Sequence, residues 1–178
     1  MTPPAALETI ARRALETALG QAPDELRRMT TGRRNEVFAA EVAGQGLILR
    51  LNADPRPLEG SARHIPIFRD LDIPVPDILA ADYSKVRLPL AWQLQSRMPG
   101  RDIGEVIHDL GRRQLEDLAF RIAGVFERLA TLAPQAWFGW TSRGYATWLD
   151  RMTDSAREIA ERDRRTGVVG DDLVRLVR

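Results

Sequence analysis

The sequence predicts an α+β fold in which a five-stranded antiparallel sheet is followed by a helical region. Two observations lead to this prediction. Short apolar segments separated by turn residues are concentrated between residues 26 and 97, as in strands that are joined by hairpins. After Gly100 the apolar residues instead recur at i, i+3, i+4 and i+7, which is typical of amphipathic helices.

The first expected element is a helix over residues 5–19, whose apolar residues follow a helical spacing and which Gly20 would end. A helix with one apolar face needs a surface to cover, so we expect it to lie on the sheet. Strands are expected over residues 26–29, 37–42 and 47–51, and the Gly-Gln-Gly segment at 44–46 is the expected hairpin turn.

Residues 53–60 are expected to form a polar loop, followed by a helix that ends near Leu71. Proline fits only the first turn of a regular helix, so Pro66 either places the start of this helix near Arg63 or kinks it. Strands over 77–82 and 90–97 would complete the sheet. Helices are expected over 103–109, 112–132 and 145–165, and the apolar stripe of the second is expected to face a core.

Composition narrows the functional classes. With 178 residues, 44% of them hydrophobic and 29% charged, the chain suits a globular protein of one domain, or a small lobe with part of another. The net charge of +1 gives no reason to expect nucleic acid or a membrane as partner. The lack of cysteine excludes thiolate metal sites, and only His64 and His108 are present. With no secretory or membrane-spanning pattern, we expect a cytoplasmic protein.

Three segments could hold a ligand. The Thr30-Thr31-Gly32-Arg33-Arg34-Asn35 turn could fold over phosphates, although an ordinary hairpin connection is the alternative. Arg50 ends an apolar strand and could point at a phosphate, or else at solvent or a surface carboxylate. Because Lys85 is the only lysine, a cation that grips phosphate here would be an arginine. The extended segment 95–100 could pair with the edge of a purine, or be a linker without a ligand.

The order of features from Leu71 to Asp102 is informative: a helix end, a strand entry stiffened by Pro74 and Pro76, two apolar strands, and a Pro99-Gly100 break into a helix. This order resembles the nucleotide lobe of the aminoglycoside/macrolide phosphotransferase family, small-molecule kinases of protein-kinase-like fold. The Gly-x-x-Asn-x-Val segment from Gly32 and the Phe-Gly-Trp segment at 138–140, which precedes a helix with a tryptophan, are also similar to that family.

The resemblance implies a kinase-like nucleotide-binding N-lobe over residues 1–97, and a hinge with a truncated helical C-lobe over 98–178. It implies part of a small-molecule O-phosphotransferase, which transfers the γ-phosphoryl group of ATP or GTP, with Mg²⁺, to a hydroxyl of an aminoglycoside- or macrolide-like substrate. The implied nucleotide-binding residues are Gly32, Arg34, Asn35, Arg50, Glu59, Gln95, Ser96 and Met98.

Within that set the resemblance assigns roles. Arg50 would hold the phosphates, with Glu59 as its helix partner, although Arg63 or His64 could face the phosphates instead. Gln95 would lie behind the base. The main chains of Ser96 and Met98 would bond the base, and the Met98 side chain would pack on its face.

No catalytic residue and no Mg²⁺ ligand is assigned. Kinases of this type use a His-x-Asp-x-x-x-x-Asn loop, and the only asparagines here are Asn35 and Asn52. We therefore expect a chain that binds nucleotide weakly or not at all and does not turn over. The alternatives are a non-catalytic nucleotide- or partner-binding module whose exposed C-lobe helices bind a partner or a second copy, an enzyme whose other half is absent, and a helical scaffold with a small sheet.

Overall fold

The structure is a computed structural model of the chain, and it describes residues 3–29, 35–133 and 144–166. The chain separates into two compact units, residues 1–132 and 133–178. The first unit contains the whole sheet and the helices α1 to α4. The second contains one described helix, α5.

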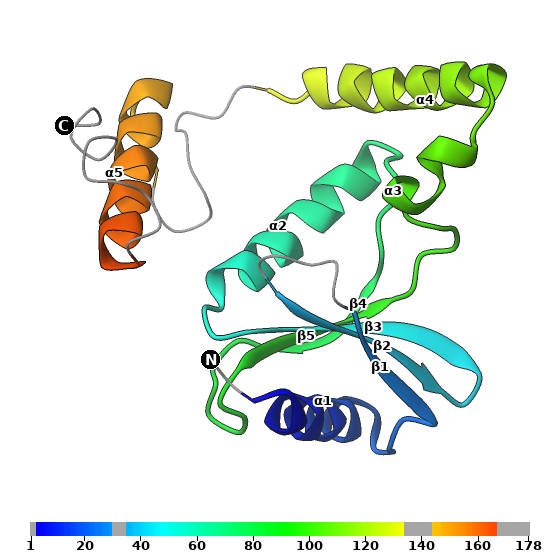
Figure 1. The fold of residues 1–178 in the computed structure, drawn as a ribbon, viewed down its shortest axis with the longest axis vertical. Coiled ribbons are helices and arrows are strands. Elements are labelled where there is room, and N and C mark those ends of the chain that lie inside the picture. Colours follow the sequence, from blue (N-terminus) through cyan, green and yellow to red (C-terminus); the bar gives the residue numbers. More distant parts are fainter. Residues whose placement is uncertain (1–2, 30–34, 134–143, 167–178) are drawn as a thin grey trace. The chain divides into compact units, whose positions relative to one another are not determined.

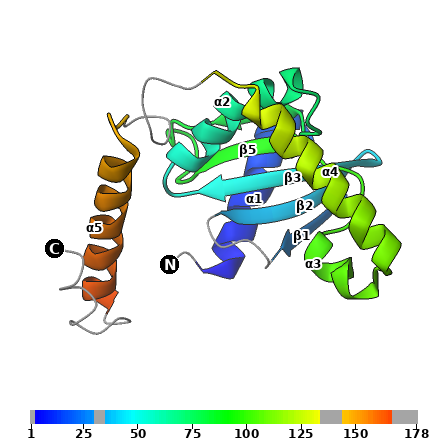
Figure 2. The same ribbon diagram turned by 90° about the horizontal axis from the view of Figure 1, so that it is seen from above.

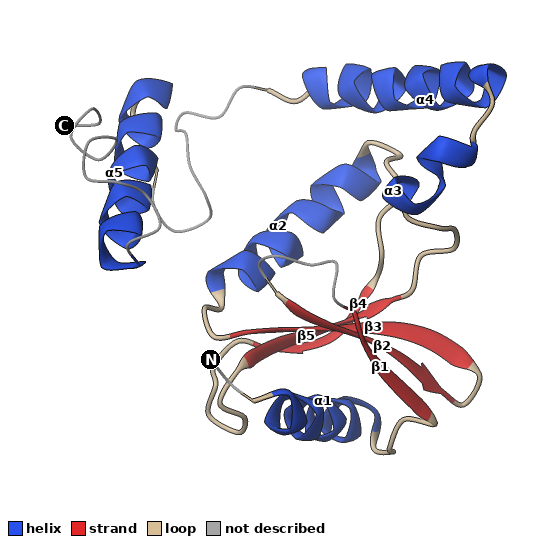
Figure 3. Ribbon diagram, viewed as in Figure 1, coloured by secondary structure: helices blue, strands red, loops and turns tan. Residues whose placement is uncertain are grey.

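The sheet has five antiparallel strands in the order β1-β2-β3-β5-β4 (Figures 1 and 3). Their bounds are β1 Glu25–Met29, β2 Glu36–Val42, β3 Gln45–Asn52, β4 Ile78–Asp82 and β5 Ala91–Ser96. The first three strands follow one another as hairpins, whereas β5 inserts between β3 and β4. The expected five-stranded antiparallel sheet is confirmed, and β3 is its central strand, with β2 and β5 on its two sides.

Helix α1, Pro4–Leu19, covers one face of the sheet, on the side opposite α2 (Figure 1). Seen from above, α1 runs across the strands behind the sheet (Figure 2). Gly20 ends the helix in the left-handed conformation with φ of 72°, which glycine adopts without steric cost. Leu7, Ala11 and Leu15 are buried against the sheet, as the expected helix over 5–19 requires.

The strands alternate between two faces because successive side chains of a strand point to opposite sides. The face toward α1 is apolar, and its buried members form one hydrophobic cluster: Phe38, Ala40, Val42, Leu47, Leu49, Leu51, Trp92 and Leu94. Most of the hydrophobic core of the first unit lies in this layer. The other face, toward α2, carries the intervening residues of the same strands.

The turn between β2 and β3 lies one residue earlier than expected. It consists of Ala43 and Gly44, which have φ angles of 50° and 75°, and β3 already begins at Gln45. Two successive positive φ angles match the right-handed twist of a hairpin, which explains why the two-residue turn replaces the expected Gly-Gln-Gly turn. Asp24 supports it, because its Oδ2 accepts a hydrogen bond from the Ala43 N–H at 2.8 Å.

Helix α2, Arg56–Asp70, corrects two expectations: residues 56–60 are helical and not loop, and the helix starts well before Arg63. Pro57 lies in the first turn, where a missing N–H costs nothing, and the Asp54 side chain accepts from the Arg56 N–H at 3.1 Å. The helix continues through Pro66. Leu58 and Ile65 are buried, so tertiary packing offsets the cost of the internal proline.

After the sheet come α3 Ile103–Val106, the short 3₁₀ helix η1 Ile107–Asp109, α4 Arg112–Ala130 and α5 Trp148–Thr166. These confirm the helices expected after Gly100. The expectation that the stripe of α4 faces a core is wrong, because α4 has no buried residue and Phe126 is 66% exposed. Of the described helices, none combines the length and apolar character needed to cross a membrane.

Candidate functional site

The face of the sheet toward α2 is polar at its centre. In the neighbouring strands β3 and β5, Arg50 lies directly opposite Gln93, and Gln95 lies opposite Ile48 on the same face. The alternation that sends Leu49, Leu51 and Leu94 into the apolar core sends these three polar side chains to the other side. Helix α2 contacts β3 and β5, so it borders this polar face.

Arg50 is half-buried and bonds to neutral groups. Its Nη1 donates to the Ser61 hydroxyl at 2.8 Å and to the Gln93 Oε1 at 3.4 Å. Within the described ranges no carboxylate forms an ion pair with it. A half-buried cation that has only neutral partners keeps most of its charge uncompensated, which suits a site for an anion.

Gln93 organises the polar face. It is fully buried, at 0% exposure, and its Nε2 donates to the Leu58 carbonyl at 3.1 Å and to the Tyr83 hydroxyl at 2.7 Å. Its Oε1 accepts from Arg50 and also from the Gln95 Nε2, the latter at 2.8 Å. We call the three side chains of Arg50, Gln93 and Gln95 the amide relay. It joins two residues that were predicted for the nucleotide site.

Sequence reasoning missed Gln93, Ser61 and Tyr83. A signal for Gln93 existed: two glutamines two residues apart in the strand segment Ala-Trp-Gln-Leu-Gln-Ser must share a face, and a buried polar side chain needs partners. Ser61 and Tyr83 gave no comparable signal, because each reaches the amide relay from a different element, α2 and the segment after β4.

Burial changes the acid–base behaviour of this face. It lowers the pKa of the Arg50 guanidinium, which the nearby Tyr83 partly opposes. Burial also raises the pKa of Tyr83, its hydrogen bond with Gln93 acts in the opposite direction, and the charge of Glu59 raises the pKa further. Arginine does not deprotonate in proteins, so Arg50 remains a cation that water hydrates poorly.

The expected pairing of Arg50 with Glu59 is not formed. Glu59 lies in the first turn of α2 with an exposed side chain, and it is Ser61, two residues further on, that bonds Arg50. The physical reason is the early start of α2, which places Ser61 over β3. The His64 Nδ1 contacts the Gly60 carbonyl of its own helix at 2.8 Å. A role of Glu59, Arg63 or His64 toward phosphates therefore stays a prediction.

The end of β5 and the residues after it have backbone groups that do not pair within the sheet. The Ser96 N–H donates to the Asp77 carbonyl at 2.9 Å, so only its carbonyl could serve a base. Met98 follows the strand, is 41% exposed, and within the described ranges its N–H has no hydrogen-bond partner. The backbone alternation thus leaves an acceptor at Ser96 and a donor at Met98 as the available pair.

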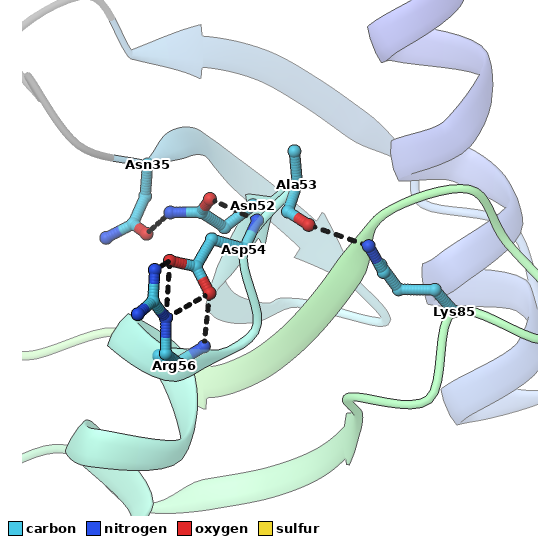
Figure 4. A network of polar contacts seen from close by, with 6 residues as sticks. All are labelled: Asn35, Asn52, Ala53, Asp54, Arg56 and Lys85. Carbon is cyan, nitrogen blue, oxygen red and sulfur yellow. Dashed lines mark hydrogen bonds and ion pairs between the residues drawn. The ribbon is translucent and has the colours of Figure 1, made fainter. Parts of the chain in front are cut away.

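Gly32 and Arg34 lie outside the described residues, so their predicted roles are untested. Asn35, at the entry to β2, is described: its Oδ1 accepts from the Asn52 Nδ2 at 2.7 Å (Figure 4). Asn52 is on the same face of β3 as Arg50. Its Oδ1 accepts from the Asp54 N–H at 2.9 Å, which links Asn35 through the end of β3 to the start of α2.

Lys85 bonds the loop between β3 and α2: its Nζ donates to the Ala53 carbonyl at 2.9 Å (Figure 4). The only lysine of the chain is therefore engaged at a loop and does not take part in the amide relay. In the described part of the chain, no group of three or more acidic, histidine or cysteine side chains could hold a metal ion.

Comparison with known proteins adds the following. A family model described as the phosphotransferase enzyme family matches residues 25–175. No curated protein matches the chain. The aminoglycoside phosphotransferase APH(4)-Ia superposes with a TM-score of 0.58 at 19% identity, covering 84% of this chain and 50% of that one.

Two further solved structures carry ligands. A thermostable mutant of APH(4)-Ia in ternary complex with AMP-PNP and hygromycin B has a TM-score of 0.61 at 20% identity, covering 91% of this chain and 54% of that one. The streptomycin-ATP-APH(2")-IIa ternary complex has a TM-score of 0.58 at 14% identity, covering 99% of this chain and 57% of that one. The chain thus spans about half the length of these proteins and shares their fold.

Proposed function

The chain belongs to the phosphotransferase enzyme family, and from this premise we propose that it is the nucleotide-binding portion of a small-molecule O-phosphotransferase. Its fold is the α+β, kinase-like fold of aminoglycoside phosphotransferases. We propose residues 1–97 as the nucleotide-binding lobe and residues 98–178 as the hinge and helical part. The parent reaction is γ-phosphoryl transfer from ATP or GTP, with Mg²⁺, to a hydroxyl of an aminoglycoside- or macrolide-like molecule.

One observation carries the proposal: Arg50 is a half-buried cation with neutral partners on the polar face of the sheet. A buried charge is ordinarily paired, and a nucleotide triphosphate supplies several negative oxygens for a planar guanidinium. Arg50 would bind and neutralise phosphate oxygens, while Ser61 and Gln93 hold its guanidinium in place. Bound Mg²⁺ would neutralise further phosphate charge, and no ligand for it is assigned in this chain.

The base would bind at the other end of the amide relay. Gln95 lies at the end of β5, and the segment after it offers the Ser96 carbonyl and the Met98 N–H. An acceptor and a donor along one extended segment match the donor and acceptor on the edge of a purine. The Met98 side chain would then pack on one face of the base.

The decisive experiment measures thermal unfolding of the chain with and without Mg-ATP and Mg-GTP. Binding by this chain alone is expected to be weak, so each nucleotide is added at a concentration high enough to register weak binding. Under that condition we expect nucleotide to raise the Tm, because a ligand that binds only the folded state stabilises it. Arg50→Ala should abolish this rise. Arg69→Ala is the matched control, because it removes an arginine of α2 that pairs with the exposed Asp77. If neither nucleotide shifts the Tm of the unaltered chain, the proposed function is wrong.

We further propose that these 178 residues hold nucleotide without transferring its phosphoryl group. The sequence contains no asparagine after Asn52, so no His-x-Asp-x-x-x-x-Asn loop follows the hinge. The test follows nucleotide diphosphate formation by the pure chain, with Mg-ATP and an aminoglycoside acceptor. A sustained rate above that of a heat-denatured sample would contradict this part of the proposal.

A non-catalytic partner-binding module is the second candidate, and the exposure of α4 favours it. The helix presents Ile122, 47% exposed, and Phe126, 66% exposed, one turn apart on one side. Exposed apolar side chains in such an arrangement are typical of surfaces that another protein segment covers. This candidate predicts association of the chain even when nucleotide has no effect.

A further inference from the structure

The direction of the hydrogen bonds in the amide relay is determined by its neighbours. A guanidinium can only donate and a backbone carbonyl can only accept. Gln93 contacts Arg50 on one side and the Leu58 carbonyl on the other. Its amide must therefore turn the Oε1 toward Arg50 and the Nε2 toward Leu58. The reverse orientation would place the Nε2 donor against the guanidinium donor of Arg50 and the Oε1 acceptor against the carbonyl acceptor of Leu58.

The orientation of Gln93 in turn determines that of Gln95. The Gln93 Oε1 accepts from the Gln95 Nε2 at 2.8 Å. If Gln95 were reversed, two carbonyl oxygens would face each other at that distance, which is repulsive. The Nε2 of Gln95 therefore donates to Gln93, and the Oε1 of Gln95 is the atom that remains for another partner.

That remaining atom is a buried acceptor. Gln95 is only 6% exposed, and among the residues that the structure describes no donor bonds its Oε1. A buried polar atom without a partner is unfavourable and uncommon in folded proteins. Gln95 is the last residue but one of β5, and it directly precedes the segment whose Ser96 carbonyl and Met98 N–H are proposed to bind the base.

We infer that the Gln95 Oε1 accepts a hydrogen bond from the 6-amino group of adenine, so that this chain selects ATP over GTP. The inference rests on the proposed nucleotide site and adds the identity of the base. Adenine presents an amino donor at position 6, whereas guanine presents a carbonyl acceptor there. Guanine would place its oxygen against the Gln95 oxygen and leave both without a donor.

Gln93 is then a positioning residue for base selection, although it does not touch the base. Without its amide, Gln95 is free to reverse and to present its Nε2 instead. A reversed Gln95 donates to the guanine oxygen as readily as the native one accepts from the adenine amino group. Gln93→Met should therefore narrow the preference for ATP, whereas a residue with a merely structural role would affect both nucleotides equally.

The experiment measures Kd by titration calorimetry for the Mg complexes of ATP, GTP and purine riboside triphosphate, which lacks the 6-amino group. We expect the unaltered chain to bind ATP about tenfold more tightly than GTP. Gln95→Met should weaken the binding of ATP about tenfold. It should weaken the binding of purine riboside triphosphate by less than about twofold, because this analogue has no 6-amino group that Gln95 could bind. Gln45→Met, at an exposed glutamine of β3, is the control that should change neither.

The outcomes separate the two hypotheses. If none of the three nucleotides binds, the proposed function fails and this inference with it. If nucleotides bind but GTP binds as tightly as ATP, only this inference is overturned. The same holds if Gln95→Met weakens the binding of ATP and of the analogue equally. The comparison of ATP with GTP needs no variant, so equal affinities would overturn the inference even where a substitution prevents folding, which far-ultraviolet circular dichroism would reveal.

Discussion

Arg50 and Gln93 lie opposite each other in the neighbouring strands β3 and β5, and the completely buried Gln93 accepts a hydrogen bond from the half-buried guanidinium. A neutral amide thus takes the place where a carboxylate would cancel the charge of Arg50. The arrangement orients the cation through Ser61 and Gln93 while leaving its charge available to an anionic ligand. Gln93 should consequently matter both for the stability of this part of the fold and for ligand binding.

Gln93→Met should lower the free energy of unfolding by about 2 kcal/mol, because it leaves the Leu58 carbonyl and the Gln95 Nε2 without their buried partner. Methionine has a similar shape, so the loss reports hydrogen bonding more than packing. Urea unfolding followed by circular dichroism measures it. Gln45→Met at the exposed start of β3 should change the free energy by less than about 0.5 kcal/mol. Equal effects of the two substitutions would show that the amide relay does not stabilise the fold.

Ala43→Asn should stabilise the hairpin between β2 and β3 by about 0.5 kcal/mol. Ala43 has a φ of 50°, in the left-handed region that is costly for alanine and favourable for asparagine before a glycine. Thermal unfolding should show a higher midpoint for Ala43→Asn. Ala43→Val should show a lower midpoint, because a β-branched residue resists this conformation. A lower midpoint for the asparagine variant would contradict the two-residue turn.

Asp54 should make the stability of the start of α2 dependent on pH. Its hydrogen bond with the Arg56 side chain lowers the pKa of its carboxyl group, and the Arg56 N–H contributes in the same direction. A pKa that is lower in the folded than in the unfolded state stabilises the fold above the unfolded value of about 4, and this contribution is lost as the pH falls through the folded value.

Asp54→Asn keeps one oxygen for the Arg56 N–H and removes the charge together with the second oxygen that accepts from the Arg56 guanidinium. The unaltered chain should therefore exceed this variant in stability at pH 7, and the difference should shrink below about pH 4. Because Asp54 is 41% exposed, the difference at pH 7 should stay below about 1 kcal/mol. Urea unfolding at pH 7 and at pH 3.5 measures it, and a difference that grows on acidification would refute the assignment.

The exposed side of α4 should promote self-association of the chain. Replacing both Ile122 and Phe126 by serine should reduce the concentration dependence of light scattering, because the two side chains are one helical turn apart and largely exposed. Phe120→Ser is the matched control: this residue is also exposed, but it is about 200° around the helix from Ile122. Scattering that does not respond to the double substitution would exclude this side of α4 as the contact.

Local patterns were sufficient for much of the fold. The strands, the order of sheet then helices, and the Gly20 end of α1 all follow from residue spacing and turn residues, and the structure confirms them. Of the two alternatives that Pro66 allows, a helix start near Arg63 is wrong: α2 begins at Arg56 and continues through the proline, because the packing of Leu58 and Ile65 stabilises it. The same limit applies to α4, whose apolar spacing indicates a helix but not what covers it.

By itself the sequence determined that Gln93 and Gln95 share one face of their strand, because they are two residues apart, and that Arg50 alternates with the leucines of another strand. Only the tertiary structure decided that Arg50 meets an amide and a serine instead of Glu59. The register between β3 and β5 and the start of α2 set those contacts, and both depend on packing between segments far apart in the chain, which no local pattern encodes.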